Sequence, residues 1–217
     1  MGRRVKEAYC VTGTANGADS AAEALLRLLE GRRSAAPGQL GEPGPDPAQL
    51  RRLLAIASRA PDHGGLEPWR FILIEGDARA RASARLADCH ALENAAMAPE
   101  KRAKFTAVMG RIFLAAPTVV AVVSHGDPAA TIPIFEQELS AGAVCMNLLT
   151  AAHAMGFDAG WVTGFAASNP LAMAALGAEA GEKIAGLIHI GTARERPAER
   201  KRPDLDAIAT RWRDTGA

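Results

Sequence analysis

The 217-residue chain carries 25 Lys and Arg residues against 24 Asp and Glu residues, a formal net charge of +1. This balance argues against a nucleic-acid-binding protein and against a polybasic membrane-surface protein, since both need a marked basic surplus. Apolar residues make up 48% of the chain, which excludes a disordered protein. Cys10, Cys89 and Cys145 are far apart and form no C-x-x-C motif, so we expect no disulfide framework, no metal site and a cytoplasmic location.

The two ends of the chain differ from its middle. Residues 1–18 contain several glycines and no apolar period, so we predict a flexible N-terminal extension there. Beyond Thr192 the chain is rich in charge and carries Pro197 and Pro203, a pattern typical of an extended arm. Together with this C-terminal arm, the remaining residues are predicted to form a single domain over 19–217.

Helix caps, prolines and apolar periods divide this domain into about four strands and six helices. Their irregular order favours an α+β fold in which helices surround a small sheet. In chain order, the expected elements are a helix from Ser20 to Gly31, a loop over 35–45, a helix from Pro47 to Pro61, a strand over 69–74, helices over 77–92 and 99–115, a strand over 118–124, a helix over 134–155, a strand over 157–163, a helix from Pro170 to Gly177 and a strand over 184–190.

The uncharged stretch 139–157 has the length of a short membrane helix. Ser140, Asn147 and His153 interrupt it, and it holds more Ala and Gly than Leu, Ile and Val. We therefore predict a helix buried in a protein core and no membrane span. His153 and Cys145 inside this helix are interpreted as core residues.

The pair Arg32-Arg33, followed by Ser34, comes directly after the first helix. Two guanidinium groups and a hydroxyl suit a phosphate monoester, whose oxygens accept forked, charge-assisted hydrogen bonds. The alternative is a helix C-terminus whose cations interact only with the helix dipole. The chain has neither G-x-G-x-x-G after a strand nor G-x-x-x-x-G-K-[ST], so side chains must hold the phosphate of any bound nucleotide.

Two further segments combine glycines with groups able to bind a ligand. Arg59 and His63 lie in a Pro- and Gly-rich loop before the strand that begins at Trp69, and rigid loops often carry binding residues. The alternative is a solvated helix end and a capped turn. Farther along, Gly160 and Gly164 bracket Trp161, Val162 and Thr163, which could place backbone against a flat ring. Ordinary packing of the tryptophan is the alternative there.

The order and spacing of these segments resemble the nitroreductase family, specifically its compact subgroup. The resemblance runs from about residue 24 to residue 208. Its carriers are Leu28-Leu29-Glu30-Gly31-Arg32-Arg33-Ser34, Arg59-Ala60-Pro61-Asp62-His63, Pro68-Trp69-Arg70-Phe71, Glu136-Gln137-Glu138-Leu139-Ser140-Ala141-Gly142 and Gly160-Trp161. It implies a nitroreductase-like α+β fold, with a small, mostly antiparallel sheet flanked by helices, that forms an intertwined homodimer with FMN at the subunit interface.

Carried over position by position, the resemblance implies a cofactor-binding set and no catalytic residue. Arg32, Arg33 and Ser34 would hold FMN. Arg59 and His63 would reach a flavin from the neighbouring subunit. The remaining wall would consist of Trp161, Val162 and Thr163, and the C-terminal arm would embrace the partner.

Three positions depart from the family pattern. Glu67 replaces a Gln that many members carry before Pro-Trp, and Val162 replaces an Arg found in the subgroup. Ala36 stands where other members place a Lys near the flavin pyrimidine. A cation is useful at that place because the reduced flavin gathers negative charge. Arg59 is our candidate for it.

The resemblance implies a ping-pong oxidoreductase that takes hydride from NAD(P)H and reduces nitroaromatic, quinone or similar flat acceptors. Two alternatives stay open. One is other flavin chemistry on the same fold, such as dehalogenation or flavin fragmentation. The other is a non-enzymatic flavin-binding protein. The sequence indicates neither the physiological acceptor nor a preference for NADH or NADPH.

Overall fold

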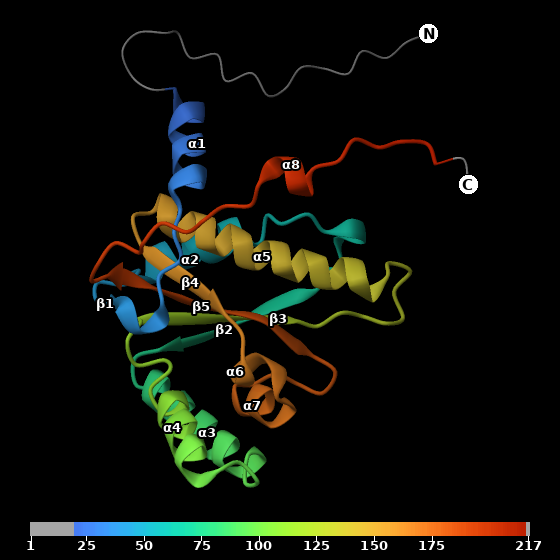
Figure 1. Cartoon of the computed structure of the whole chain (residues 1–217). Helices are drawn as coiled ribbons and strands as arrows, with labels where there is room; N and C mark the ends of the chain where they lie inside the picture. Colours follow the sequence, from blue (N-terminus) through green and yellow to red (C-terminus); the bar gives the residue numbers. More distant parts are fainter. Residues whose placement is uncertain (1–19, 216–217) are drawn as a thin grey trace, which may run out of the picture.

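The computed structural model describes residues 20–215, which form five strands and eight α-helices around one antiparallel sheet (Figure 1). The predicted N-terminal extension lies outside these residues. The sheet has the order β1-β5-β3-β2, and β4 also pairs with β5. The strands are β1 (Leu40–Gly41), β2 (Trp69–Glu75), β3 (Thr118–Ser124), β4 (Asp158–Val162) and β5 (Lys183–Ala193). All ladders between these strands are antiparallel, which confirms the expected α+β class and a small antiparallel sheet.

Two layers of helices cover the sheet, because alternate residues of a strand point to opposite faces. Val120 and Val122 of β3 pack with α2 and α5, while Val119 and Ala121 pack with the helices of the other face. β3 is buried along its whole length, as its Val run predicts. The helices are α1 (Ala21–Gly31), α2 (Pro47–Ala57), α3 (Ala78–Glu93), α4 (Pro99–Met109), α5 (Ile134–Ala154), α6 (Phe165–Ser168), α7 (Pro170–Ala175) and α8 (Leu205–Ile208).

Helix starts lie where their capping residues predict. The Ser20 side chain accepts from the backbone N–H of Glu23 at the start of α1. At the start of α2, Asp46 and Gln49 form a reciprocal capping box. These contacts satisfy N–H groups that have no partner within the helix.

The structure contains two short helices, α6 and α8, that the sequence does not predict, and it differs from the prediction in two further segments. The helix expected over 99–115 ends at Met109, because Gly110 caps it with an N–H bond to the Thr106 carbonyl and residues 110–115 turn back toward the sheet. The loop expected over 35–45 contains β1, where Leu40 pairs with Ala193 of β5. A strand of two residues is too short to show an alternating pattern in the sequence, so β1 can be recognised only from its pairing with β5.

α5 is the longest helix of the described chain and lies across one face of the sheet (Figure 1). Its inner side contributes Val144 and Leu148 to the core. No helix among the described residues is long and apolar enough to cross a membrane. A stripe of its apolar side chains stays exposed: Phe135 (68%), Leu139 (57%) and Met146 (39%).

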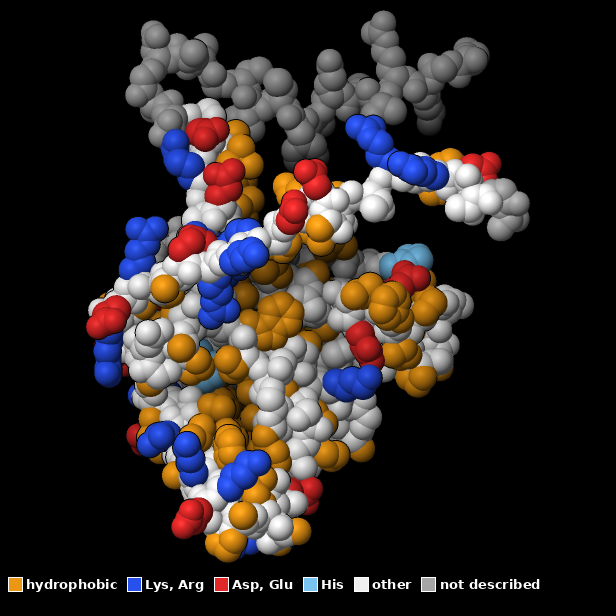
Figure 2. Space-filling view, viewed as in Figure 1, with side chains coloured by type: hydrophobic (Ala, Val, Ile, Leu, Met, Phe, Trp, Pro, Cys, Tyr) orange, Lys and Arg blue, Asp and Glu red, His pale blue; other side chains and the backbone are white. Residues whose placement is uncertain are grey.

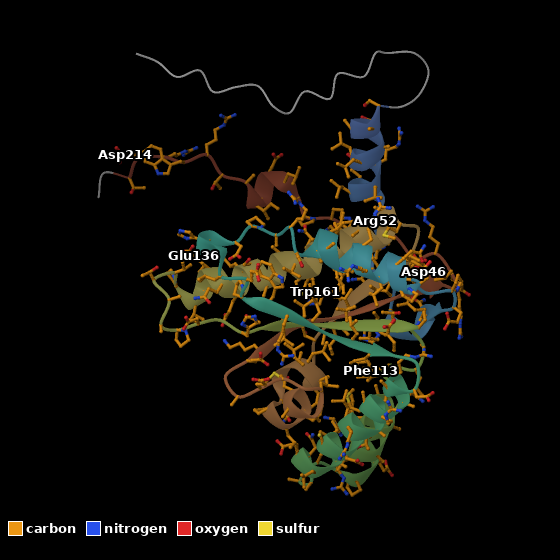
Figure 3. All side chains as sticks on the ribbon, turned by 180° about the vertical axis from the view of Figure 1, so that it is seen from behind. Asp46, Arg52, Phe113, Glu136, Trp161 and Asp214 are labelled. Atoms are coloured by element: carbon orange, nitrogen blue, oxygen red, sulfur yellow. The ribbon has the colours of Figure 1, made fainter. Side chains whose placement is uncertain are left out.

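His189 lies in the middle of β5 and is fully buried. Its ring is 5.7 Å from that of Phe113, which packs beneath the sheet (Figure 3). Within the described residues, neither ring nitrogen has a hydrogen-bond partner. Burial therefore lowers the pKa of His189 to about 4, from an ordinary value of 6.5.

This buried histidine should make the protein less stable in mild acid. Between pH 6.5 and 4 the unfolded chain binds a proton at His189 that the folded chain does not. The free energy of unfolding should therefore fall as the pH falls through this range, by about 2–3 kcal/mol from this group. Urea denaturation at pH 7.5 and pH 4.5 measures the loss. His189→Leu should lose less stability over the same interval, and an unchanged loss in that variant would show that the pH dependence lies elsewhere.

Candidate functional site

Arg32, Arg33 and Ser34, here called the arginine clamp, follow α1 and run beside β4. Arg32 Nη1 donates to Ser34 Oγ at 3.2 Å, and Arg33 Nη1 donates to the Arg32 carbonyl at 2.8 Å. The backbone is fixed next to them, since the Ala35 N–H donates to the Ala159 carbonyl at 3.0 Å. A Cβ at Gly160 would come within 2.2 Å of the Ala35 carbonyl oxygen. Gly160 therefore permits the close approach that holds the clamp against the sheet.

The C-terminal arm returns to the arginine clamp. Arg200 and Arg202 of the arm, with the clamp and Ala198, surround a polar pocket of about 130 Å³. Figure 2 shows Lys and Arg side chains gathered where the arm passes below α1. Glu199 forms ion pairs with Arg33 and Arg202.

Positive charge is in surplus at this polar pocket. Burial lowers the pKa of Arg33, and the positive charges of Arg202, Arg196 and Arg32 lower it further. Among the residues that the structure describes, Glu199 supplies the carboxylate that pairs with this group of arginines. A doubly charged phosphate would relieve the repulsion and accept forked hydrogen bonds from the guanidinium groups. The residues present therefore fit a phosphate monoester.

His153 ties the arginine clamp to the C-terminal end of α5. Its Nε2 lies 2.8 Å from the Arg33 carbonyl oxygen and its Nδ1 lies 2.8 Å from the Leu149 carbonyl oxygen. Both partners are carbonyl acceptors, so the ring can donate to either of them from the nitrogen that carries a hydrogen. The sequence prediction of a simple core residue misses this contact with the clamp.

β4 ends beside a second and larger pocket. Trp161 and Val162 are neighbours in a strand and point to opposite faces of the sheet. The Trp161 Nε1 donates to the Ala185 carbonyl at 3.1 Å, and its indole lies over Gly186, where a Cβ would be 2.3 Å from Nε1. Val162 and Thr163 instead line the second pocket. The three residues predicted to line one wall of the flavin site therefore separate: Trp161 lies on the α5 face of the sheet, whereas Val162 and Thr163 line the second pocket.

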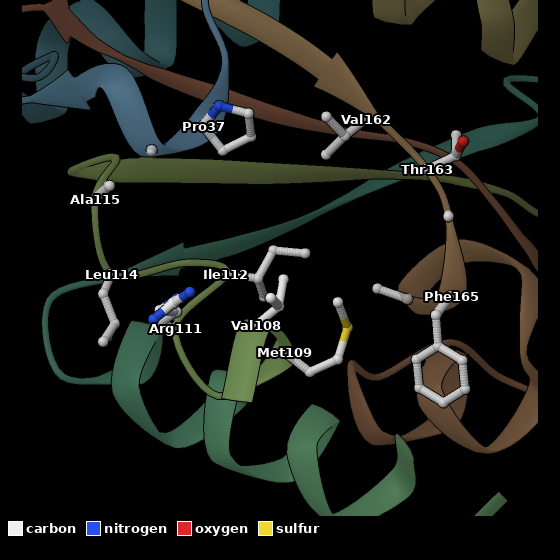
Figure 4. Close-up of a pocket in the computed structure, with 13 residues that line it drawn as sticks. Pro37, Val108, Met109, Arg111, Ile112, Leu114, Ala115, Val162, Thr163 and Phe165 are labelled. Atoms are coloured by element: carbon white, nitrogen blue, oxygen red, sulfur yellow. The ribbon is translucent and has the colours of Figure 1, made fainter. Parts of the chain in front are cut away.

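This second pocket, here called the apolar pocket, has a volume of about 770 Å³ (Figure 4). Pro37 and Gly38 form one side of it, three residues after the clamp. Three residues span at most about 11 Å, so the phosphate-sized pocket and the apolar pocket are neighbours. The lining residues are Pro37, Gly38, Val108, Met109, Arg111, Ile112, Leu114, Ala115, Val162, Thr163, Gly164, Phe165 and Ala166.

The loop with Arg59 and His63 is shaped by Asp62. Its carboxylate accepts from the backbone N–H groups of Leu66 at 3.1 Å and Glu67 at 2.8 Å. Glu67 has a φ of +48°, a left-handed backbone that is uncommon outside glycine. These contacts hold His63 at the surface, where its Nδ1 lies 2.8 Å from a Glu136 carboxylate oxygen.

His63 lies far from the arginine clamp of the same chain. His63 contacts Glu136 at the start of α5, whereas the Arg33 carbonyl contacts His153 at its end. A helix rises 1.5 Å per residue, so these contacts are about 25 Å apart along the axis. Figure 3 shows Glu136 at one end of α5, far from α1. One chain thus brings the clamp together with Val162 and Thr163 but not with His63.

The sequence does not single out four residues that line the two pockets or contact the clamp: Arg111, His153, Arg200 and Arg202. The run Arg200-Lys201-Arg202 was a visible signal, since a basic cluster in a charged arm suits an anion. Arg111 gave no such signal, because it follows a segment with several other exposed cations.

Comparison with known proteins identifies the family. The family model described as "Nitroreductase family" matches residues 30–192. The Escherichia coli (strain K12) protein named "Putative NAD(P)H nitroreductase YdjA" is 36% identical over 167 residues, which cover 77% of this chain and 87% of that protein. This chain therefore belongs to the nitroreductase family.

Solved structures share the fold. A nitroreductase-like family protein from Bacillus cereus superposes with a TM-score of 0.75 at 24% identity, covering 92% of this chain and 99% of that one. A nitroreductase with bound FMN from Bacteroides fragilis NCTC 9343 has a TM-score of 0.63 at 17% identity, covering 87% and 98%. The nitroreductase-like fold expected from the sequence is confirmed.

His153→Ala should destabilise the protein, because it leaves the Arg33 carbonyl without its partner. Leaving a buried acceptor without its hydrogen-bond partner typically costs about 1–3 kcal/mol. Urea denaturation measures this loss. Thr150→Ala is the matched control, since within residues 20–215 the Thr150 hydroxyl bonds only to the Met146 carbonyl of its own helix. That variant should change stability by less than about 0.5 kcal/mol. Equal stabilities for the two variants would contradict the role given to His153.

Proposed function

We propose that this protein is an FMN-dependent oxidoreductase that takes hydride from NAD(P)H and passes it to nitroaromatic, quinone or similar flat acceptors. One observation carries the proposal: an arginine-lined pocket of phosphate size lies beside an open apolar pocket, with only Ala35 and Ala36 between their lining residues Ser34 and Pro37. FMN has a matching division into an anionic phosphate and a flat ring system. The names of the family relatives support the same activity.

The arginine clamp, assisted by Arg200 and Arg202, would hold the phosphate. Val162 and Thr163 would border the ring at the edge of the apolar pocket. When bound, FMN supplies the hydride acceptance and donation that amino-acid side chains lack. The protein supplies position, positive charge and an open pocket.

A single pocket suits a ping-pong order of reaction. Among the described residues that line the apolar pocket, none carries a carboxyl group, and Arg111 is the only charged one. No side chain of the lining is therefore placed as a proton donor, and water would supply protons. NAD(P)H and the acceptor would enter the same pocket in turn, which is the basis of the proposed order.

A homodimer would complete the site. The exposed stripe Phe135, Leu139 and Met146 of α5 offers an apolar surface to a second copy, and so does α1, whose Leu25 and Leu26 are about half exposed. Pairing two copies of α5 in opposite directions would place the start of one helix beside the end of the other. Arg59 and His63 of one chain would then lie near the arginine clamp of its partner.

The purified protein should be yellow and should release FMN on denaturation. Under anaerobic conditions NADH or NADPH should bleach the flavin spectrum, and a nitroaromatic or quinone should restore it. A protein that binds FMN but is not bleached by either nucleotide would be a flavin carrier. Consumption of reduced FMN only in the presence of oxygen would indicate flavin fragmentation. Either result would contradict the proposed reductase.

Mixing two variants tests the shared site. Arg33→Ala and Arg59→Ala each damage both sites of their own homodimer, and loss of a charge-assisted contact should weaken FMN binding about tenfold to a hundredfold. In a heterodimer of the two variants, one site carries both substitutions and the other carries neither. Refolding the mixture should therefore restore tight FMN binding in one site per heterodimer.

Isothermal titration measures this stoichiometry. Arg52→Ala, an exposed arginine on α2 (Figure 3), is the charge control and should bind FMN like the wild type. A mixture with no tight site would show that both residues serve the flavin of the same chain, or none.

A further inference from the structure

The apolar pocket contains one feature that hydride transfer alone does not require. Its lining is apolar except for the Thr163 hydroxyl and the guanidinium of Arg111. Its volume of about 770 Å³ lies within the usual range for small-molecule sites. Figure 4 shows Arg111 in the wall beside Leu114, across the pocket from Val162 and Thr163. Figure 2 shows hydrophobic side chains in a hollow above α4, with Lys and Arg side chains at its lower border.

The segment that carries Arg111 is held in place by a different arginine. Arg79 Nη1 donates to the carbonyls of Leu114 at 3.3 Å and Ala116 at 2.9 Å, which fixes the 110–115 turn to α3. Gly110 caps α4 at the beginning of the same turn. The position of Arg111 is therefore set by the fold on both sides of the turn.

Arg111 itself is free to bind a ligand. Within residues 20–215, its guanidinium makes no hydrogen bond or ion pair with another side chain or with the backbone. A guanidinium presents several donors in one plane and binds carboxylates with two parallel hydrogen bonds. Beside apolar walls from Val108 and Ile112, it forms a site with one anionic end and one apolar body.

We propose that the apolar pocket selects acceptors that are aromatic anions, with an aromatic carboxylate as the simplest case. The ring would contact Val108, Ile112 and Phe165, and the carboxylate would pair with Arg111. This inference rests on the proposed function, because it assigns the acceptor class of that same site. Arg111 is then a specificity-determining residue, whereas the arginine clamp serves the cofactor.

Two ligands of equal shape isolate the charge. 4-Nitrobenzoate and 4-nitrobenzamide differ at one group, which is anionic in the first and neutral in the second. Titration calorimetry with the FMN-loaded protein, in the absence of NAD(P)H, measures both dissociation constants without turnover. The wild type should bind the carboxylate about tenfold more tightly, as expected for one charge-assisted pair at an exposed rim.

Variants assign this preference to Arg111. Arg111→Ala should bind the two ligands equally, and Arg111→Lys should keep part of the preference, because an ammonium retains the charge but not the planar fork. Lys104→Ala removes an exposed cation of α4 that does not line the pocket and should leave the preference unchanged.

The outcomes separate this inference from the proposed function. A wild-type protein that binds FMN and prefers neither ligand would overturn the role of Arg111 and leave the oxidoreductase assignment intact. A preference that survives in Arg111→Ala would have the same effect. If Arg111→Ala instead weakens FMN binding or shifts the midpoint potential of the flavin, Arg111 serves the cofactor and the proposal is wrong. A wild-type protein that binds no FMN would overturn the proposed function itself.

Discussion

The length of α5 is the constraint on which the site depends. The helix is held at its start by the His63–Glu136 contact and at its end by the contact between His153 and the Arg33 carbonyl. A packed helix is a rigid rod, so these two ends stay about 25 Å apart. A site that needs groups from both ends can form only where the start of one helix meets the end of another. The exposed apolar stripe of α5 supplies a surface for that meeting, which connects the length of the helix to the proposed dimer.

The arginine clamp has an electrostatic cost that a ligand would offset. Like charges held close together oppose folding, and the lowered pKa of Arg33 reports the mutual repulsion of the neighbouring arginines as well as burial. The fold restrains this group with backbone contacts, through Ala35 to β4 and through His153 to α5. One carboxylate, from Glu199, compensates part of the charge. Anything that binds the folded form alone raises stability by mass action, so an anionic ligand would stabilise this end of the molecule.

Local signals in the sequence predicted most of the architecture. Capping residues marked the starts of α1 and α2, and an unbroken Val run marked β3 as a buried strand. Features that depend on contact with a segment far away in the sequence could not be predicted. β1 exists only because β5 extends to Ala193 to pair with it. Likewise, the arginines of the arm become site residues only because the chain returns to the clamp over a long distance.

The sequence predicts which residues belong to the candidate site, but it does not predict how their side chains are placed relative to one another. Grouping Trp161 with Val162 ignored the alternation of a strand, which sends their side chains to opposite faces. The helix expected over 99–115 shows the same limit. An isolated glycine inside an apolar period is compatible with a continuing helix or with a C-terminal cap. In the folded chain α4 ends at Met109 and Gly110 is its C-terminal cap, because the following residues pack against the sheet. The structure thereby replaces the expected last turns of a helix with the turn that bears Arg111, and this turn forms part of the wall of the apolar pocket.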